Sequence, residues 1–393
     1  MEAPCSRLII FITFIHCFKI NTNKGGYIMN ITKEQVLEAL KNVDDPDLKK
    51  DLVTLGMIKE LEVNGKNVNF TVVLTTPACP MKEMIHKACV NAVLHFVDAG
   101  ANVNVKMTSD VTSRKSSGPL LPNVKNIIGV ASGKGGVGKS TVASNLALAL
   151  VKQGASVGLV DADIYGPSQT IMFDVVHEKP MIKVVDGKNK IIPVESYGVK
   201  LLSIGFFADT SQAIVWRGPM ASKALVQMFS DADWGDLDYL IIDLPPGTGD
   251  IHLSLVGAVP LNGVVIVSTP QLVALADAKK GVGMFRLPSI NVPVLGIVEN
   301  MSYFTPPELP NNKYYIFGKD GAKKLAEDLD VPLLGEIPLV QSICEAGDAG
   351  RPAVLQESTP QAIAFMEMAS AVAQQLSIQN AKTPVAQVAD VKW

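Results

Sequence analysis

The stretch of sequence that decides the fold is Gly133-Lys134-Gly135-Gly136-Val137-Gly138-Lys139-Ser140. It fits the pattern G-x-x-x-x-G-K-[ST], and it lies between an apolar run at residues 127–131 and a helical pattern at residues 142–151. Glycines let backbone N–H groups turn inward around phosphate oxygens, and the N-terminus of the following helix adds a positive dipole end. The sequence therefore predicts a strand, a phosphate-binding loop and a helix in succession.

Lys139 and Ser140 indicate what this loop binds. Lys139 can reach the β- and γ-phosphates of a nucleotide, and Ser140 can ligate Mg²⁺ through its hydroxyl. Contacts to the nucleotide are expected from the whole loop and from Thr141 behind it. A glycine-rich turn with a solvated lysine is the alternative, and the flanking strand and helix patterns argue against it. We therefore expect ATP and Mg²⁺ as cofactors.

Lys134 directly follows the first glycine of the loop. A second lysine at this place is typical of the deviant Walker A group of P-loop ATPases, which includes the MinD, ParA and Mrp proteins. In that group the lysine reaches across a dimer interface to the nucleotide of the partner. The resemblance thus implies a homodimer with ATP sandwiched between its subunits and a catalytic role for Lys134 beside Lys139. A surface lysine without such a role is the alternative.

Two acidic stretches resemble further motifs of that group. Asp161 and Asp163 follow one apolar run, at the switch I position, and Asp243 follows another, at the position of the Walker B aspartate. The resemblance implies that Asp161 and Asp243 lie near Mg²⁺, whereas Asp163 orients or activates the attacking water. The glycines of residues 247–250 indicate a switch II loop that senses the γ-phosphate. A plain Asp pair at a strand end is the alternative for Asp161 and Asp163.

Asn300 follows the apolar run at residues 292–298, where related proteins read the adenine base; an ordinary polar loop residue is the alternative. Taken together, the motifs resemble the Mrp/ApbC family of iron–sulfur cluster carriers more than MinD or ParA. They lie at residues 161–168, 243–250, 299–302, 337–339 and 345–348. Three stretches before residue 112 resemble the MIP18-type (DUF59) domain that usually precedes the ATPase in bacterial Mrp proteins. They lie at residues 44–46, 55–58 and 74–80.

The cysteines depart from the Mrp pattern. Most Mrp proteins carry Cys-x-x-Cys soon after the Glu-Asn-Met-Ser motif, and two such pairs would bridge a [4Fe–4S] cluster between subunits. Residues 303–311 contain no cysteine here. Cys79, in the family-typical Thr-Pro-Ala-Cys-Pro loop, is then the best remaining iron–sulfur ligand. Cys89 is expected to be a buried helical thiol. Cys344 is expected to open a helix, and a packing role is as plausible for it as any other.

The predicted fold class is α/β: a doubly wound, mostly parallel P-loop NTPase sheet with a small N-terminal α/β domain. From residue 126 onward, short apolar runs alternate with helical patterns, and such runs suit strands covered on both faces. The small domain is expected to contain a helix capped by Thr32 and a hairpin around Asn64-Gly65. We expect the following bounds: a MIP18-like domain at residues 29–111, a linker at 112–124, the ATPase domain at 125–378, with a final helix at 360–376, and a flexible tail at 379–393.

Composition excludes several classes of protein. The chain of 393 residues has a formal net charge of −3, with 48% hydrophobic and 19% charged residues, which argues against disorder and gives a nucleic-acid-binding role no support. Residues 377–393 hold two lysines and a proline and no basic amphipathic helix, so no membrane partner is expected. Five widely spaced cysteines, an odd number, favour a reducing cytoplasm over a disulfide scaffold.

Residues 1–28 are predicted to be a translated leader, with Met29 as the true start. The apolar run at residues 8–18 is too short to span a bilayer. Residues 24–29 back-translate to a purine-rich sequence a few bases before a start codon, as a ribosome-binding site would be. N-terminal sequencing of natively expressed protein tests this hypothesis.

Three functions follow from the resemblance. The first is an ATP-hydrolysing iron–sulfur cluster carrier that works as a nucleotide-switched homodimer, with iron–sulfur scaffold proteins and recipient apoproteins as partners and a [4Fe–4S] cluster held transiently. The second is a positioning ATPase like MinD or ParA. The third is a regulatory ATPase of the same family that no longer binds a cluster.

Overall fold

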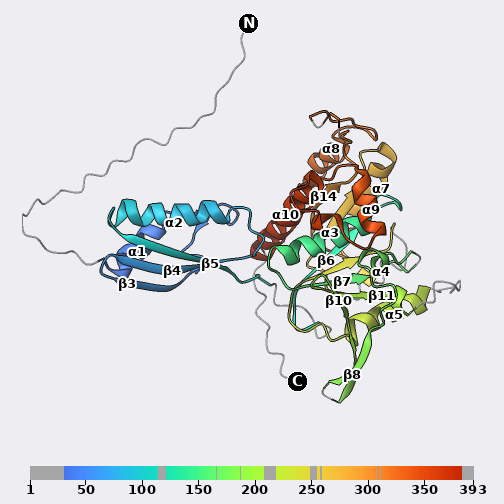
Figure 1. The fold of residues 1–393 in the computed structure, drawn as a ribbon, viewed down its shortest axis with the longest axis horizontal. Coiled ribbons are helices and arrows are strands. Elements are labelled where there is room, and N and C mark those ends of the chain that lie inside the picture. The colour runs from blue at the N-terminus through green and yellow to red at the C-terminus, as the bar shows by residue number, and fades with distance from the viewer. Residues whose placement is uncertain are drawn as a thin grey trace, which may run out of the picture.

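The chain forms a small unit and a large unit that lie side by side (Figure 1). The computed structural model describes residues 31–113, 121–164, 166–185, 187–207, 218–247, 255–256, 259–306, 308–309 and 311–382. The predicted leader at residues 1–28, most of the predicted linker and residues 248–250 of the predicted switch II loop lie outside the described residues.

The small unit packs two helices on a three-stranded sheet in the order β3-β4-β5. Helix α1 (Lys33–Leu40) begins with the expected cap: Thr32 Oγ1 accepts from the backbone N–H of Gln35, and the Gln35 side chain accepts from that of Thr32. The hairpin around Gly65, which has φ +60°, is also confirmed. The remaining elements are β1 (Asp44–Asp45), β2 (Lys50–Asp51), β3 (Ile58–Asn64), β4 (Asn67–Leu74), α2 (Lys82–Phe96) and β5 (Asn102–Ser109).

The large unit contains an eight-stranded sheet in the order β10-β11-β7-β12-β6-β13-β14-β15. All neighbouring strands pair in parallel except β10, which is antiparallel to β11 at the edge. The predicted fold class is therefore confirmed. The strands are β6 (Val124–Ala131), β7 (Val157–Asp161), β10 (Val194–Ser196), β11 (Val199–Ser203), β12 (Leu237–Asp243), β13 (Gly263–Ser268), β14 (Val294–Glu299) and β15 (Leu333–Glu336).

Helices cover both faces of this sheet, which explains the continuous apolar runs of its central strands. Along β6, Ile128 and Val130 pack into the core under α3 and α10, whereas Ile127 and Ala131 pack into the core on the other face, under α5, α7 and α8. Alternate side chains thus feed two separate cores. The helices are α3 (Lys139–Lys152), α5 (Gly218–Ser230), α7 (Leu272–Phe285), α8 (Gly321–Asp328) and α10 (Pro360–Lys382).

The last helix corrects one predicted boundary. Helix α10 continues to Lys382, so residues 379–382 are helical rather than part of a tail, and residues 383–393 lie outside the described residues. The extra turn is held because Asn380 Nδ2 donates to the carbonyl of Thr112 at 3.0 Å and to Asn126 Oδ1 at 2.9 Å. Such long-range side-chain bonds leave no periodic signal in the sequence.

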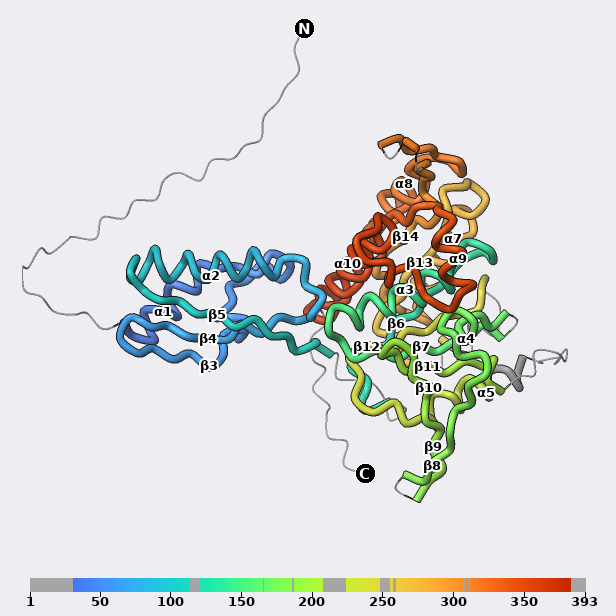
Figure 2. Tube along the Cα trace, viewed as in Figure 1, coloured from blue at the N-terminus to red at the C-terminus, as the bar shows by residue number. Residues whose placement is uncertain are grey.

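Several shorter elements were not predicted. The hairpin of β8 (Met181–Val185) and β9 (Lys188–Ile192) projects from the large unit (Figure 2). The others are α4 (Gln169–Met172) and two short 3₁₀ turns, η1 (Ile204–Phe206) and η2 (Ala353–Leu355). The helix expected at Cys344 is present as α9 (Gln341–Asp348) and begins three residues earlier. Most contain too few residues for a hydrophobic period to be recognised.

Hydrogen bonds and one buried apolar side chain connect the small unit to the large unit. Thr76 Oγ1 and the hydroxyl of Tyr239 lie 3.0 Å apart, and both side chains are buried. Gln374 Nε2 of α10 donates to Asp47 Oδ1 at 2.6 Å. Ala78 belongs to the core cluster beneath α3 and α10. The loop that carries Cys79 therefore lies against the large unit.

Candidate nucleotide-binding site

Parallel strands bring the predicted acidic residues together at one edge of the large sheet. Asp161 ends β7 and Asp243 ends β12, and the two are paired in register. The glycine loop follows β6, the neighbour of β12, so it opens onto the same edge. Ligands of open α/β sheets bind outside the carboxyl ends of their strands. The topology thus gathers the loop and both carboxylates where such a ligand binds.

Two glycines of the loop have backbone conformations that L side chains rarely adopt. Gly136 has φ +81° and Gly138 has φ +83°. A Cβ on Gly138 would overlap the side-chain amide of Asn300, and one on Gly133 would overlap the backbone of α7 at Asp277. The loop is therefore held to glycine by torsion and by close packing.

We expect Gly138→Ala to weaken nucleotide binding strongly, because the new methyl group must displace Asn300 and strain the loop. Equilibrium titration with a fluorescent ADP analogue measures this effect. Gly281→Ala, in α7 and outside the loop, is the matched control, since no atom lies within 4 Å of a Cβ at that position and no positive φ is recorded there. Equal affinity of the Gly138→Ala variant and the wild-type protein would contradict this account of the loop.

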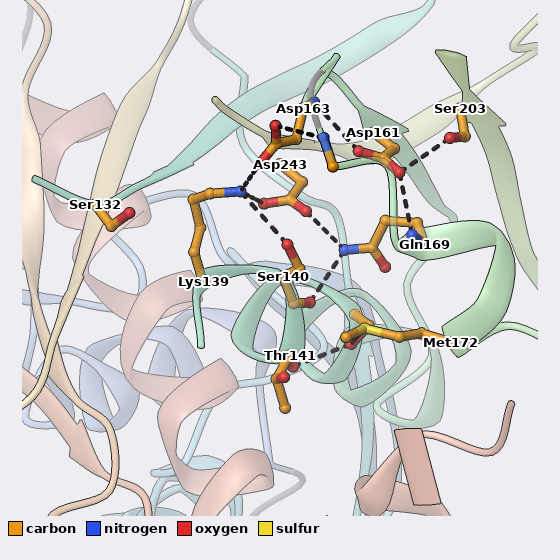
Figure 3. A network of polar contacts seen from close by, with 12 residues as sticks. Ser132, Lys139, Ser140, Thr141, Asp161, Asp163, Gln169, Met172, Ser203 and Asp243 are labelled. Carbon is orange, nitrogen blue, oxygen red and sulfur yellow. Dashed lines mark hydrogen bonds and ion pairs between the residues drawn. The ribbon is translucent and has the colours of Figure 1, made fainter. Parts of the chain in front are cut away.

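Lys139 is almost fully buried and is surrounded by carboxylates. Its Nζ lies 2.5 Å from Asp243 Oδ1 and 3.6 Å from Asp163 Oδ2 (Figure 3). Burial raises the pKa of Asp163, and the charge of Asp243 adds to this effect, although Lys139 opposes it. The ammonium group of Lys139 thus supplies the positive charge between the carboxyl groups of Asp243 and Asp163.

Asp161 is fully buried, and protein donors reach both of its oxygens. Ser203 Oγ and the backbone N–H of Gln169 donate to Oδ2 at 2.9 and 3.1 Å, and the backbone N–H of Asp163 donates to Oδ1 at 3.2 Å. Burial and the neighbouring Asp243 raise the pKa of Asp161 to about 7. Three carboxyl groups, Asp161, Asp163 and Asp243, thus lie near one lysine.

The donors present suit a magnesium ion that arrives with a nucleotide. Ser140 lies at the start of α3 next to Lys139, with its hydroxyl 3.4 Å from Nζ. Within the described residues, no group of three or more His, Cys, Asp or Glu side chains forms a complete metal site. Mg²⁺ is commonly bound by one or two carboxylates together with substrate phosphates and water. Ser140, Asp243 and Asp161 fit that incomplete protein donor set, and their assignment to the metal stays a prediction.

Gln169 is the site residue that the sequence did not indicate. Its side chain lies between α3 and Asp243, where Nε2 donates to Asp243 Oδ2 at 2.9 Å and to the carbonyl of Ser140 at 3.0 Å. It follows the switch I motif as one polar residue in a short helix, so no pattern marks it. Ser203, which donates to Asp161 from the end of the neighbouring strand, was also missed, because a single serine at a strand end matches no motif.

A cavity of about 340 Å³ lies beside the glycine loop. Asn300, which is buried, lines it and donates from Nδ2 to the carbonyl of Val137 at 2.9 Å. Thr141, Met172 and Pro338 also line it. The cavity has the apolar lining and few polar groups expected of a base pocket. A base site here, and the role of Asn300 in it, stay predictions.

Lys134 lies apart from this buried cluster. It is exposed, and together with Thr269 and Phe317 it lines a second cavity of about 140 Å³. Leu272 and Val273, at the start of α7, are 83% and 62% exposed. They lie between Gln271 and Ala274, which line this second cavity, and exposed apolar patches are typical of surfaces that contact another protein.

The structure separates the described cysteines. Cys79 is half-buried in the loop against the large unit, and Cys89 is buried in the core of the small unit, as expected. Burial raises the pKa of the Cys89 thiol to about 12. Cys344, in the middle of α9, is exposed and lines the predicted base cavity, so it is not a packing residue.

Two family models match the chain. Residues 123–373 match the NUBPL iron-transfer P-loop NTPase model, and residues 33–113 match the iron–sulfur cluster assembly protein model. The predicted domain bounds lie close to these matches, although the matches do not test the linker or the tail.

Similar proteins agree with both models. An iron–sulfur cluster carrier protein of Synechocystis is 45% identical over 351 residues, 88% of this chain and 99% of that protein. The chloroplastic iron–sulfur assembly factor HCF101 of Arabidopsis thaliana is 40% identical, over 90% of this chain and 66% of its own length. Among solved structures, a nucleotide-binding protein from Archaeoglobus fulgidus in complex with ADP has a TM-score of 0.53 and 37% identity, covering 62% of this chain and 93% of that one.

Proposed function

Since the chain belongs to the NUBPL iron-transfer P-loop NTPase family, we propose that it is an ATP-hydrolysing iron–sulfur cluster carrier that delivers clusters to apoproteins. The observation that carries the ATPase part is Lys139 enclosed by Asp243 and Asp163 at the mouth of the glycine loop. The name of the Synechocystis relative supports the carrier part.

Hydrolysis needs Lys139 to change partners. The residue now neutralises Asp243 and Asp163, and in the proposed active state it moves to the β- and γ-phosphates. Mg²⁺, when bound with the nucleotide, neutralises charge on the phosphates. Asp163, released from Lys139, is then free to orient the attacking water or to take its proton. Ser140 and Asp243 are the residues proposed to hold the metal.

The proposed active form is a homodimer. Lys134 is exposed at the loop, and no carboxylate among the described residues forms an ion pair with it. Leu272 and Val273 present apolar surface nearby. A second copy that covered this surface would bury the apolar side chains and bring its own lysine to the nucleotide. Both consequences support the ATP-sandwiched arrangement.

Cys79 is the proposed ligand to the cluster, which is the cargo of the protein. Burial raises the pKa of its thiol, and the charges of Asp47 and Asp45 add to that effect. A thiol must lose its proton before it can bind iron. Asp47 is also the residue that Gln374 holds across the contact between the units. Release of this contact would uncover the loop, so movement of the units is the proposed link between nucleotide state and cluster binding.

This link has a direct structural route. Tyr239, which contacts Thr76 of the cysteine loop, and Asp243, which contacts Lys139, lie on the same strand. They are four residues apart, which corresponds to about 13 Å at about 3.3 Å per residue. A change in the position of β12 at the nucleotide end therefore reaches the Cys79 loop through one rigid element.

A family member that no longer binds a cluster is the second candidate. The observation in its favour is that residues 303–311, where most Mrp proteins carry a pair of cysteines, contain none. No observation favours a positioning ATPase of the MinD or ParA type. No helix among the described residues is long and apolar enough to cross a membrane. The cytoplasm stays our proposed location.

Anaerobic reconstitution with iron and sulfide tests the carrier function. Wild-type protein is expected to retain iron and acid-labile sulfide after desalting, and Cys79→Ser is expected to lose most of both. Cys344→Ser is the matched control, because that thiol is also free and is more exposed. Absence of iron from the wild-type protein with ADP and with ATP would contradict the carrier function and favour the cluster-free candidate.

A further inference from the structure

Gln169 occupies the centre of the nucleotide site and is fully buried. Figure 3 shows its side chain between Ser140 at the start of α3 and Asp243 at the end of β12. Its backbone N–H donates to Asp161 Oδ2 at 3.1 Å. One residue thus contacts three of the elements that form the predicted metal site.

The orientation of the amide group follows from its partners. Nε2 lies 2.9 Å from Asp243 Oδ2 and 3.0 Å from the backbone carbonyl of Ser140. Both partners are oxygen acceptors, so the NH₂ group must face them, and the opposite flip of the amide would place oxygen against oxygen. Oε1 therefore points away from these two acceptors.

Oε1 of Gln169 is buried and has no hydrogen-bond partner among the described residues. A buried acceptor without a donor is unfavourable, and most such groups in folded proteins are paired. In their ionised forms, Asp243 and Asp161 offer acceptors only. A ligand that brings its own proton donors would satisfy this atom.

We propose that Gln169 is a positioning residue for the Mg²⁺–nucleotide complex: its NH₂ group fixes the Asp243 carboxylate, and its Oε1 accepts a hydrogen bond from water bound to the metal. This inference deepens the proposed ATPase function and rests on it. Water is the donor that fits, because Mg²⁺ usually keeps several of its waters when a protein binds it.

The fixed carboxylate matters most when Lys139 leaves. Lys139 holds Oδ1 of Asp243, whereas Gln169 holds Oδ2. Once the lysine turns to the phosphates, Gln169 is the side chain that continues to restrain Asp243. A restrained carboxylate binds a metal with less loss of conformational freedom than a mobile one.

The test replaces the amide with a side chain of similar length. Gln169→Met removes both the donor and the acceptor. Gln169→Glu keeps an acceptor at the Oε1 position but replaces the donor to Asp243 and Ser140 with a second oxygen. Gln153→Met is the matched control: Gln153 Nε2 also donates two hydrogen bonds, to the Met366 carbonyl and to Ser370 Oγ, and its Oε1 is also buried without a partner. Gln153 lies at the far end of α3 from the glycine loop.

The measurement is the affinity for a fluorescent ADP analogue as a function of Mg²⁺ concentration and, separately, in EDTA. We expect Gln169→Met to weaken the apparent Mg²⁺ affinity of the complex by about 10- to 100-fold, the range for residues that support metal ligands. The ADP affinity in EDTA should stay close to that of wild type, because Gln169 lines neither the predicted base cavity nor the cavity beside Lys134. Gln169→Glu should bind Mg²⁺ more tightly than Gln169→Met, and Gln153→Met should match the wild type.

Each other outcome overturns one claim. Gln169 would be only a packing residue if Gln169→Met kept the Mg²⁺ dependence of the wild type. The same would follow if its affinity for the ADP analogue fell by equal factors with Mg²⁺ and in EDTA. Equal Mg²⁺ affinity of Gln169→Met and Gln169→Glu would exclude a role for Oε1. Should Gln169→Met not fold, Gln169→Asn takes its place: its amide is one methylene shorter and cannot reach both Asp243 and Ser140, so wild-type Mg²⁺ affinity in this variant overturns the proposal. If the wild-type protein itself binds ADP without any Mg²⁺ dependence, the proposed ATPase function fails as well.

Discussion

Lys139→Ala is expected to lower ATP hydrolysis by about 10²- to 10³-fold, the typical cost of removing one group that stabilises transition-state charge. Lys139 is the cation nearest to Asp243 and Asp163 in the described site. Because its side chain is almost fully buried, a lysine on the surface does not take its place in the variant. Its loss also leaves Asp161, Asp163 and Asp243 without a compensating charge. We therefore expect a lower melting temperature for the nucleotide-free variant unless Mg²⁺ is supplied.

Phosphate release measured at saturating ATP tests this expectation. Lys152→Ala is the matched control, since Lys152 ends the same helix and its partner, Glu357, is mostly exposed. The control should hydrolyse ATP at the wild-type rate. Wild-type hydrolysis by Lys139→Ala would show that the reaction does not take place at this loop.

Lys134→Ala is expected to reduce hydrolysis by a similar factor, about 10²- to 10³-fold, through a different cause. Lys134 is exposed and does not contribute to the buried cluster around Lys139. Nucleotide affinity of the isolated subunit should therefore stay close to wild type. Hydrolysis should fall because the lysine acts on the nucleotide of the partner subunit.

Mixing separates this cause from a local one. Combining Lys134→Ala subunits with hydrolysis-deficient Lys139→Ala subunits should restore part of the activity, because each mixed dimer then contains one complete site. Lys41→Ala, a change of an exposed lysine on the small unit, is the control for surface charge. Full activity of Lys134→Ala alone would contradict the sandwiched dimer.

The sequence predicted the features that depend on local pattern. The glycine loop, the strands β6, β7 and β12 and the acidic residues that follow two of them have short spacings and apolar runs that suit a parallel sheet. Register then does the rest: because β7 and β12 are parallel neighbours, Asp161 and Asp243 must lie side by side. Asp161 and Asp243 could each be predicted as a site residue from its own local sequence.

The features that were missed depend on contacts between distant segments. Gln169 gains its place only because α4 lies against Asp243, which is 74 positions away along the chain. Asn380 extends α10 through bonds to Thr112 and Asn126. The cavity lined by Asn300 and Cys344 forms where the loop after β14 meets α9. No hydrophobic period or short motif records such contacts, so the sequence alone could not reveal them.

Cluster transfer to an apoprotein tests the central claim most directly. Protein reconstituted with iron and sulfide is mixed with an apo form of a [4Fe–4S] enzyme, and the recovered enzyme activity is followed with and without Mg²⁺–ATP. We expect recovery that depends on Cys79 and changes when Mg²⁺–ATP is added, with the nucleotide effect absent in Lys139→Ala. Recovery that is the same for wild type, for Cys79→Ser and for free iron and sulfide would contradict it.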